Sequence, residues 1–256
     1  MKLKSAVSIV TGAGTGSGAA CAVQLAAKGC RVVVNYSRSE KEARETVKAC
    51  EAAGSEAILA RGDVANDADC RALAQAALDK WGRIDALINN AGITKYASAS
   101  DLDALDAADF QRIYAVNLIG PYQMIRACAQ ALKEAHGSVV NLSSVAALLG
   151  TGSSVAYAAS KAALETMTLS LARALGPEVR LNVVAPGYVR TPWQVAAHGA
   201  DGAADLERRF AERAPLKAAA EAHDAAEAIV WLIEGARRIT GQIVHVDGGM
   251  HIAAPR

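Results

Sequence analysis

Short apolar runs rich in β-branched residues alternate with longer alanine-rich segments along the whole chain, and this alternation limits the fold more than any other feature. Runs of the first kind predict buried strands, and segments of the second kind predict helices. Strands connected through helices pair in parallel and are covered on both faces. The predicted strands are residues 6–12, 31–36, 56–64, 84–92, 137–144, 179–187 and 241–249. We therefore expect an α/β protein with a doubly wound parallel sheet of about seven strands and helices on both faces.

The 256 residues are expected to form a single domain, residues 1–256. No linker rich in Pro, Gly or Ser divides the chain, and no repeat occurs at solenoid spacing. Hydrophobic residues make up 52% of the chain, which is enough for a large core. In a doubly wound sheet, ligands bind beyond the carboxyl ends of the strands, near the point where the strand order reverses. Candidate functional residues are therefore sought in the segments that follow the strands.

Charge and cysteine content exclude several classes of protein. The net charge of +1 gives no electrostatic bias toward nucleic acid or an anionic membrane. No run of about 18 apolar residues occurs, and the opening MKLKSAVSIVTGAG is too short for a signal peptide. The five cysteines include no CxxC pair, which indicates free thiols in a reducing compartment. The histidines lack the spacing of metal ligands. We therefore expect a cytoplasmic protein without a metal site, a nucleic-acid partner or membrane contact.

A glycine-rich loop, TGAGTGSG at 11–18, follows the first predicted strand and opens the first predicted helix. Glycines at this place let the backbone turn tightly and approach a pyrophosphate, which the start of the helix then stabilises. The common GxGxxG spacing fails here because its third glycine would fall at Ser17. A glycine loop alone is also compatible with any tight strand–helix turn. The strand–loop–helix context favours dinucleotide binding.

The end of the second predicted strand distinguishes the two nicotinamide dinucleotides. A carboxylate there would bind the ribose 2′-hydroxyl of NAD, but residues 35–39 include no Asp or Glu. Arg38 can instead bind a 2′-phosphate, with hydroxyl donors from Ser37 and Ser39. This segment favours NADP(H), while NAD(H) stays open, since Arg38 could equally be a solvated charge at the start of a helix.

Tyr157 and Lys161 stand four residues apart in a predicted helix, within SVAYAASKAALETM at 154–167. Residues at this spacing share one helix face, with Cβ atoms roughly 5–6 Å apart. A free phenol has a pKa of about 10, and a nearby ammonium favours the phenolate and lowers that pKa. The pair could therefore exchange a proton with a substrate oxygen. On its own, a YxxxK match is more often a solvated helix face.

Several motifs follow one another in order between Thr11 and Gly249. With this set, the sequence resembles the short-chain dehydrogenase/reductase family of the single-domain type, and is similar to its 3-oxoacyl-[acyl-carrier-protein] reductases. The motifs are TGAGTGSG (11–18), GDV (62–64), NNAG (89–92), VNL (116–118), NLSS (141–144), YAASK (157–161), APG (185–187) with Thr191, and TGQIVHVDGG (240–249).

The resemblance implies a Rossmann-type fold and a role for each matching residue. The catalytic tetrad it implies is Asn117, Ser144, Tyr157 and Lys161, with Ser144 rather than Ser143 at the usual distance before the tyrosine. Ser144 would bind the developing alkoxide, and Asn117 would anchor a water beside the lysine. The implied cofactor contacts are Gly12, Thr15, Gly16, Ser17, Gly18, Ser37, Arg38, Asp63, Val64, Asn90, Ala91, Gly92, Tyr157, Lys161, Pro186, Gly187, Val189 and Thr191.

Two residues and one segment depart from the family pattern. Ser17 replaces an Ile or Leu that borders the nicotinamide, and Thr15 stands where many NADP-dependent members have Arg or Lys. Segment 215–228 lacks the usual Gly and Pro, although Asp224 with Glu227 predicts a capping box that starts the next helix there.

The segment at 192–214 is expected to form a mobile substrate lid. Trp193 begins it and is the candidate substrate contact, beside Ser144 and Tyr157; alternatively it packs the lid against the body.

The resemblance implies interconversion of a ketone and a secondary alcohol, by hydride transfer with tyrosine as general acid/base. The alternative is a 3-oxoacyl-[acyl-carrier-protein] reductase, and a third reading is a dinucleotide-binding sensor or scaffold without turnover. Acyl carrier protein is acidic, yet the helix ends at 130–137 and 172–180 carry no basic cluster, although Arg126, Arg173 and Arg180 remain. The general ketone substrate is therefore favoured. The resemblance also implies a homo-oligomer, commonly a tetramer.

Overall fold

The computed structural model describes residues 1–253, which fold around one parallel β-sheet. The sheet has seven strands in the order β3-β2-β1-β4-β5-β6-β9, and each strand is parallel to its neighbours. This confirms the predicted fold class. The strands are β1 (Val7–Val10), β2 (Arg31–Tyr36), β3 (Ala57–Arg61), β4 (Ala86–Asn89), β5 (Ser138–Leu142), β6 (Arg180–Pro186) and β9 (Ile243–Val246).

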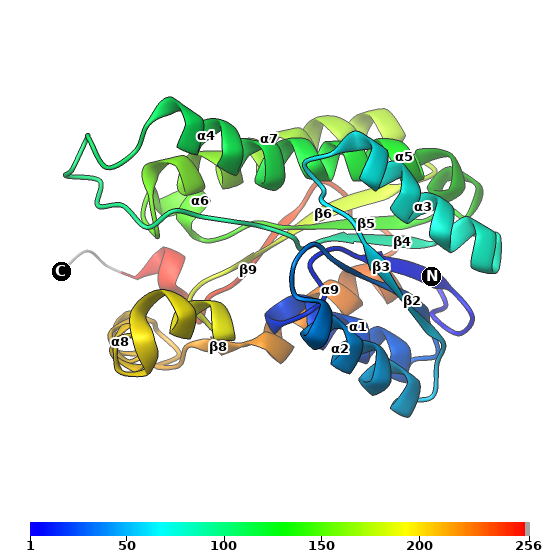
Figure 1. Ribbon diagram of the computed structural model, residues 1–256, viewed down its shortest axis with the longest axis horizontal. Helices are drawn as coiled ribbons and strands as arrows, with labels where there is room; N and C mark the ends of the chain where they lie inside the picture. The colour runs from blue at the N-terminus through cyan, green and yellow to red at the C-terminus, as the bar shows by residue number, and fades with distance from the viewer. Residues whose placement is uncertain (254–256) are drawn as a thin grey trace.

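Two layers of helices cover the sheet, one on each face (Figure 1). One layer holds α1 (Gly16–Ala27), α2 (Glu40–Ala52) and α9 (Ala222–Glu234), and the other holds α3 (Asp67–Trp81), α5 (Gly120–Glu134) and α7 (Val155–Leu175). Alternate residues of each strand feed the two cores, because side chains alternate across a strand. Val32 and Val34 enter one core, and Val33 enters the other.

The strand order reverses between β1 and β4, which pair in parallel with Ser8 beside Ala86. From β1 the chain moves outward through β2 and β3, and it then returns to continue on the other side from β4. The connections after β1 and β4 therefore diverge at the carboxyl edge of the sheet and leave a crevice there.

The predicted helix beginning near residue 107 is interrupted. It consists of α4 (Ala107–Tyr114), a π-helical turn η1 (Ala115–Ile119) and α5. A π-turn inserts an extra residue and changes the direction of the side chains it carries, and such turns are frequent at functional sites. Asn117 lies in this turn and is fully buried.

The segment after β6 departs most from the simple strand–helix alternation. A two-stranded parallel ribbon joins β7 (Val189–Arg190) to β8 (Ala220–Glu221), and sequence patterning did not predict it. Between them lies α8 (Pro192–Arg213), bent at Gly199, whose φ is 70°. In Figure 1, α8 lies at one end of the molecule, apart from both helical layers. Two short elements, α6 (Ala146–Leu149) and η2 (Met250–Ile252), complete the described chain.

The start of α9 corrects one sequence prediction. The capping box pairs Glu221 with Asp224, whereas the sequence predicted Asp224 with Glu227. The helix begins earlier because β8 pairs with β7 up to Glu221, which fixes where the extended backbone ends.

The described helices include none that is long and apolar enough to cross a membrane. The five cysteines are all buried and unpaired.

Candidate active site

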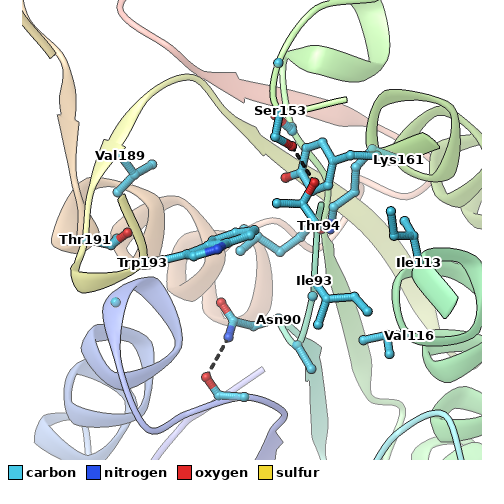
Figure 2. Close-up of a pocket in the computed structure, with 18 of the residues that line it drawn as sticks. Asn90, Ile93, Thr94, Ile113, Val116, Ser153, Lys161, Val189, Thr191 and Trp193 are labelled. Carbon is cyan, nitrogen blue, oxygen red and sulfur yellow. Dashed lines mark hydrogen bonds between the residues drawn. The ribbon is translucent and has the colours of Figure 1, made fainter. Parts of the chain in front are cut away.

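One large cavity of about 1970 Å³ opens along the carboxyl edge of the sheet. Its lining comes from the loops after β1, β2, β3, β4, β5 and β6, together with α4, α7 and α8. The glycine loop and the Tyr157–Lys161 pair both line this cavity, and Figure 2 shows Lys161 and Asn90 on its walls.

The glycine loop needs glycine at particular positions for steric reasons. Gly12 has a φ of +61°, and a Cβ there would lie 2.9 Å from the Ala91 Cα. A Cβ on Gly18 would lie 2.4 Å from the Asn90 side chain. Gly12 and Gly16 line the cavity, whereas Gly18 lies behind it and permits close packing of the loop on Asn90.

The start of α1 fits a bound pyrophosphate. The N-terminal residues of a helix have free N–H groups, which a capping side chain usually satisfies. The N-cap of α1 is Thr15, and its side chain makes no capping hydrogen bond. The donors of the first turn therefore remain available at the cavity, beside the lining residues Thr15, Gly16 and Ser17.

Two asparagines hold the glycine loop in place. The Asn90 side chain donates to the Thr11 and Gly12 carbonyls at 2.9 Å each (Figure 2). The buried Asn35 side chain accepts from the Gly12 N–H at 3.1 Å and donates to the carbonyls of Ala60 and Gly62. Asn35 thereby links the loop to β2 and β3. Sequence analysis did not assign it this role, because no motif spacing marks it.

Two arginines line the same end of the cavity as the glycine loop. Ser37 and Arg38 follow β2 and line the cavity with exposed side chains, and Arg61 joins them from the end of β3. Among the described residues, Arg38 takes part in no ion pair, so its guanidinium is free to bind an anion. Sequence analysis overlooked Arg61. Asp63 also lines this end, and its carboxylate accepts from the Ala65 N–H at 3.0 Å.

Tyr157, Lys161 and Ser144 converge at the other end. The Ser154 hydroxyl caps α7 by accepting from the Tyr157 N–H at 3.3 Å, so the first helical turn presents the phenol to the cavity. The Lys161 Nζ lies 5.7 Å from the centre of the Tyr157 ring and donates to the Leu142 carbonyl at 2.7 Å. Ser144 follows β5 directly and faces the same space.

Burial changes the pKa of both ionisable groups at this end. It raises the pKa of the Tyr157 phenol to about 12, against a smaller opposing effect of the Ser144 hydrogen bond. It lowers the pKa of the Lys161 ammonium to about 8, although the Glu165 charge opposes this. Burial is the main cause of the Tyr157 shift and Lys161 is not among its causes, so the sequence-based expectation that Lys161 lowers the pKa of the phenol finds no support in this structure.

Asn117 supports the wall of the cavity from behind and does not line it. Its Oδ1 accepts from the Ile93 N–H at 2.8 Å, and its Nδ2 donates to the Ile93 carbonyl and to the Ser160 hydroxyl at 3.0 Å each. These contacts tie the π-turn to the segment after β4 and to α7. The side chain thus fixes two walls relative to each other.

Ser143 and Ser144 have different partners. The Ser143 hydroxyl donates to the Glu165 Oε1 at 2.7 Å and to the Lys161 carbonyl at 3.3 Å. The Ser144 hydroxyl accepts only from the Ala146 N–H at 3.2 Å and interacts with the Tyr157 phenol. Ser144 is therefore the serine with a hydroxyl proton directed to the reacting end. Glu165 was not noticed in the sequence.

Two bridges close the cavity beyond Tyr157. Thr94 and Ser153 share a hydrogen bond of 2.6 Å, which joins the loop after β4 to the loop before α7 (Figure 2). The Tyr96 ring packs edge-on against His198 of α8 at 4.6 Å between ring centres. The Trp193 indole points into the cavity from α8 and lies 6.3 Å from the Tyr157 ring. Of these residues, sequence analysis had named only Trp193 as a candidate contact.

The structure brings nearly all the predicted site residues to this cavity. Seven more of them line it: Val64, Ala91, Gly92, Pro186, Gly187, Val189 and Thr191. Gly18 and Asn117 are the two predicted residues that lie behind the lining.

The helix ends considered as a docking rim do not border this cavity. The C-terminal ends of α5 and α7 lead into the starts of β5 and β6, where Ser138 pairs with Arg180, while the cavity lies at the opposite ends of these strands. Arg180 donates to three carbonyls at the end of α9, and Arg126 pairs with Asp67. The sequence-based argument against a carrier-protein substrate used the charge of these helix ends. That argument is wrong, because these helix ends do not border the cavity of this chain.

A glycine loop, a helix start that fits pyrophosphate and a Tyr–Lys pair that lines the cavity define a dinucleotide-dependent oxidoreductase site. The family model described as enoyl-(acyl carrier protein) reductase matches residues 12–251. The chain belongs to the short-chain dehydrogenase/reductase family.

Relatives with different named substrates align over nearly the whole chain. A protein named as a ketoacyl reductase of the granaticin polyketide synthase of Streptomyces violaceoruber is 38% identical, with 96% of each chain covered. The 3beta-hydroxysteroid dehydrogenase 1 of Eggerthella lenta is 37% identical, with 97% of this chain and 94% of the relative covered. A crystal structure described as a short-chain dehydrogenase/reductase from Burkholderia xenovorans has a TM-score of 0.91 and 39% identity, covering 97% and 99% of the two chains.

Proposed function

We propose that this protein is an NADP(H)-dependent oxidoreductase that interconverts a ketone and a secondary alcohol, with Tyr157 as general acid/base. The observation that carries the proposal is the convergence of Ser144, Tyr157 and Lys161 on a cavity whose other end is lined by an uncapped helix start and a glycine loop. A dinucleotide spanning this cavity would place its nicotinamide beside the phenol. The nicotinamide supplies or accepts the hydride.

The side chains supply the proton transfer. In reduction, the Tyr157 phenol donates its proton to the carbonyl oxygen, and the Ser144 hydroxyl donates a hydrogen bond to the same oxygen as negative charge develops. Lys161, fixed by its hydrogen bond to the Leu142 carbonyl, provides the positive charge that stabilises the phenolate left behind. In oxidation the same groups act in reverse.

The preference for NADP(H) rests on Arg38 at the glycine-loop end of the cavity. Arg38 is unpaired there, Ser37 adds a hydroxyl, and no carboxylate follows β2 within residues 35–39. A guanidinium binds a phosphate through two parallel hydrogen bonds, whereas a ribose hydroxyl gains little from it. NAD(H) use is the alternative, and competitive titration with the two reduced dinucleotides decides between them.

The walls beyond Tyr157 support a bulky apolar substrate. Large apolar and aromatic side chains line this part of the cavity together with polar ones: Ile93, Tyr96, Ile113, Leu149, Trp193, Leu206 and Phe210. Polar neighbours satisfy one another, as in the Thr94–Ser153 hydrogen bond and the Lys95–Asp109 ion pair of 2.5 Å. A polyhydroxylated substrate would find few free partners here, and buried unpaired hydroxyls are costly.

A 3-oxoacyl-carrier reductase is the second candidate function. It is favoured by the relatives named for ketoacyl reduction, including the 3-oxoacyl-[acyl-carrier-protein] reductase of Staphylococcus epidermidis at 32% identity. Kinetics with one 3-oxoacyl group presented on acyl carrier protein and as a small free thioester separate the two. A strong preference for the carrier-bound form would replace the first proposal by the second.

We also propose a homotetramer in the cytoplasm. Exposed apolar residues on α5 and α7, among them Tyr122, Val155 and Leu169, support further association of these helices. The unpaired thiols are consistent with a reducing compartment. Light scattering tests the assembly, and a monomeric mass of 26.4 kDa would refute it.

The first assay follows NADPH oxidation with 1-decalone, cyclohexanone and a hydroxylated cyclohexanone. We expect kcat/KM for the fused bicyclic ketone to exceed that for cyclohexanone roughly tenfold or more, since each buried methylene contributes about 0.8 kcal/mol.

Tyr157→Phe should abolish turnover and leave NADPH affinity unchanged, because only the acid is lost. Turnover retained by this variant would refute the mechanism, and equal rates for all three ketones would refute the apolar pocket.

A further inference from the structure

Glu165 is a half-buried carboxylate directly behind the catalytic groups, and the mechanism above does not use it. It lies on α7 one helical turn after Lys161, so the two side chains share a face of the helix. Its Oε1 accepts the Ser143 hydroxyl at 2.7 Å. Ser143 immediately precedes Ser144 at the end of β5, and its hydroxyl also reaches the Lys161 carbonyl at 3.3 Å.

The charges around this carboxylate are few. Lys161 is the charged group that faces it, and Ser143 is its hydrogen-bond donor from the sheet side. Around the phenol, the other titratable neighbour is Tyr96 from the loop after β4. Burial raises the pKa of Glu165 and lowers that of Lys161, whereas the attraction between the two charges opposes both shifts. Glu165 is thus the nearby anion that offsets the burial of the lysine.

We propose that Glu165 is a positioning residue with two effects: its charge keeps the proton on Lys161, and its hydrogen bond with Ser143 fixes the turn that presents Ser144. The inference rests on the proposed function for its kinetic test, because it concerns the same site.

The two effects are separated by two substitutions. Glu165→Gln keeps the shape and a hydrogen-bond acceptor for Ser143 but removes the charge. Ser143→Ala keeps the charge but removes the hydrogen bond. Glu165→Asp retains the charge and serves as the conservative variant. Glu134→Gln, which removes an exposed carboxylate at the end of α5, is the matched control.

The kinetic readout is the pH dependence of kcat for ketone reduction. Without the carboxylate charge, Lys161 loses its proton at lower pH, so the alkaline limb should move down by roughly 0.5–1 pH unit in Glu165→Gln, a threefold to tenfold change in proton affinity. Glu165→Asp and Glu134→Gln should keep the wild-type limb. Ser143→Ala should lower kcat severalfold without moving the limb.

A second readout needs neither cofactor nor turnover. The burial of the Lys161 cation makes the wild-type protein gain stability as the pH rises above the pKa of about 8. The free energy of unfolding is measured by denaturant titration at a series of pH values. In Glu165→Gln the gain in stability should begin at a pH that is lower by the same roughly 0.5–1 unit as the kinetic limb. Glu134→Gln should follow the wild-type curve.

The outcomes distinguish the inference from the proposed function. If the wild type reduces no ketone, the proposed function fails, and the unfolding curves still test the charge coupling. If the wild type is active but Glu165→Gln keeps both its alkaline limb and its unfolding curve, the charge role is wrong. An unchanged kcat in Ser143→Ala would overturn the role of the hydrogen bond.

Discussion

Burial of the charged Lys161 side chain should lower the free energy of unfolding of this protein. The side chain is 3% exposed, and burial lowers the pKa of its ammonium from 10.5 to about 8. A shift of this size corresponds to about 3 kcal/mol at 1.36 kcal/mol per pH unit. Lys161→Met removes the charge and retains a chain of similar length. It also leaves the Leu142 carbonyl without its partner, which costs about 1–3 kcal/mol.

The sign of the pH dependence follows from proton binding. Below pH 8 both folded and unfolded wild-type chains carry the proton, so the whole burial penalty is present. Between about pH 8 and 10.5 only the unfolded chain binds the proton, and the penalty fades as pH rises. The methionine variant lacks this titration. Its stability relative to the wild type should therefore fall by about 3 kcal/mol between pH 7 and pH 10.5.

Urea or guanidinium denaturation of both proteins at pH 7, 8, 9 and 10 measures this difference. Other groups also titrate in this range, since burial raises the pKa of the cysteines and of Tyr157. The contributions of the cysteines are common to both proteins and cancel in the difference. Turnover should be lost in Lys161→Met at every pH. A stability difference that stays constant from pH 7 to pH 10 would refute the argument that the lysine is buried as a cation.

Two further predictions concern the cofactor end of the cavity. Arg38→Ala should weaken NADPH binding roughly tenfold to a hundredfold, because a charge-assisted contact is lost, and should change NADH binding little. Fluorescence titration measures both affinities, with Lys41→Ala in α2 as the control. Equal losses of affinity for the two dinucleotides would show that Arg38 does not bind the phosphate. Gly12→Ala should destabilise the fold by more than about 1–2 kcal/mol, because it adds a 2.9 Å contact with Ala91 to the backbone strain of a φ of +61°. Gly54→Ala, which has a φ of +95° and open space around its Cβ, measures the strain alone. Similar losses in the two glycine variants, read from denaturant titration, would show that the close approach does not matter.

The strand–helix alternation was sufficient to predict the parallel sheet. The centre of the strand at 31–36, residues 32–34, is a continuous apolar run because both faces are buried, and this property is local and visible in the letters. The glycine loop and the Tyr157–Lys161 spacing could be predicted for the same reason, since each requirement lies within a few consecutive residues. The family resemblance then assigned residues from separate segments to one site.

Tertiary structure decided the features that depend on partners distant in sequence. The π-turn around Asn117 and the contacts of its side chain with Ile93 and Ser160 join three segments, and no local pattern marks them. The start of α9 was misplaced because the pairing of β8 with β7 determines it. The carrier-docking rim was misjudged because a sequence does not say which edge of the sheet a helix end occupies.

The pKa values of Tyr157 and Lys161 are where the sequence-based expectation and the folded structure differ most. In the sequence, Tyr157 and Lys161 are neighbours on a helix, so attraction between their ionised forms is the visible effect. In the folded protein, burial is the largest cause of both pKa shifts, and neither group is among the causes of the other's shift. Which residues form the candidate site could be proposed from the sequence, whereas their proton affinities depend on what the fold packs around them.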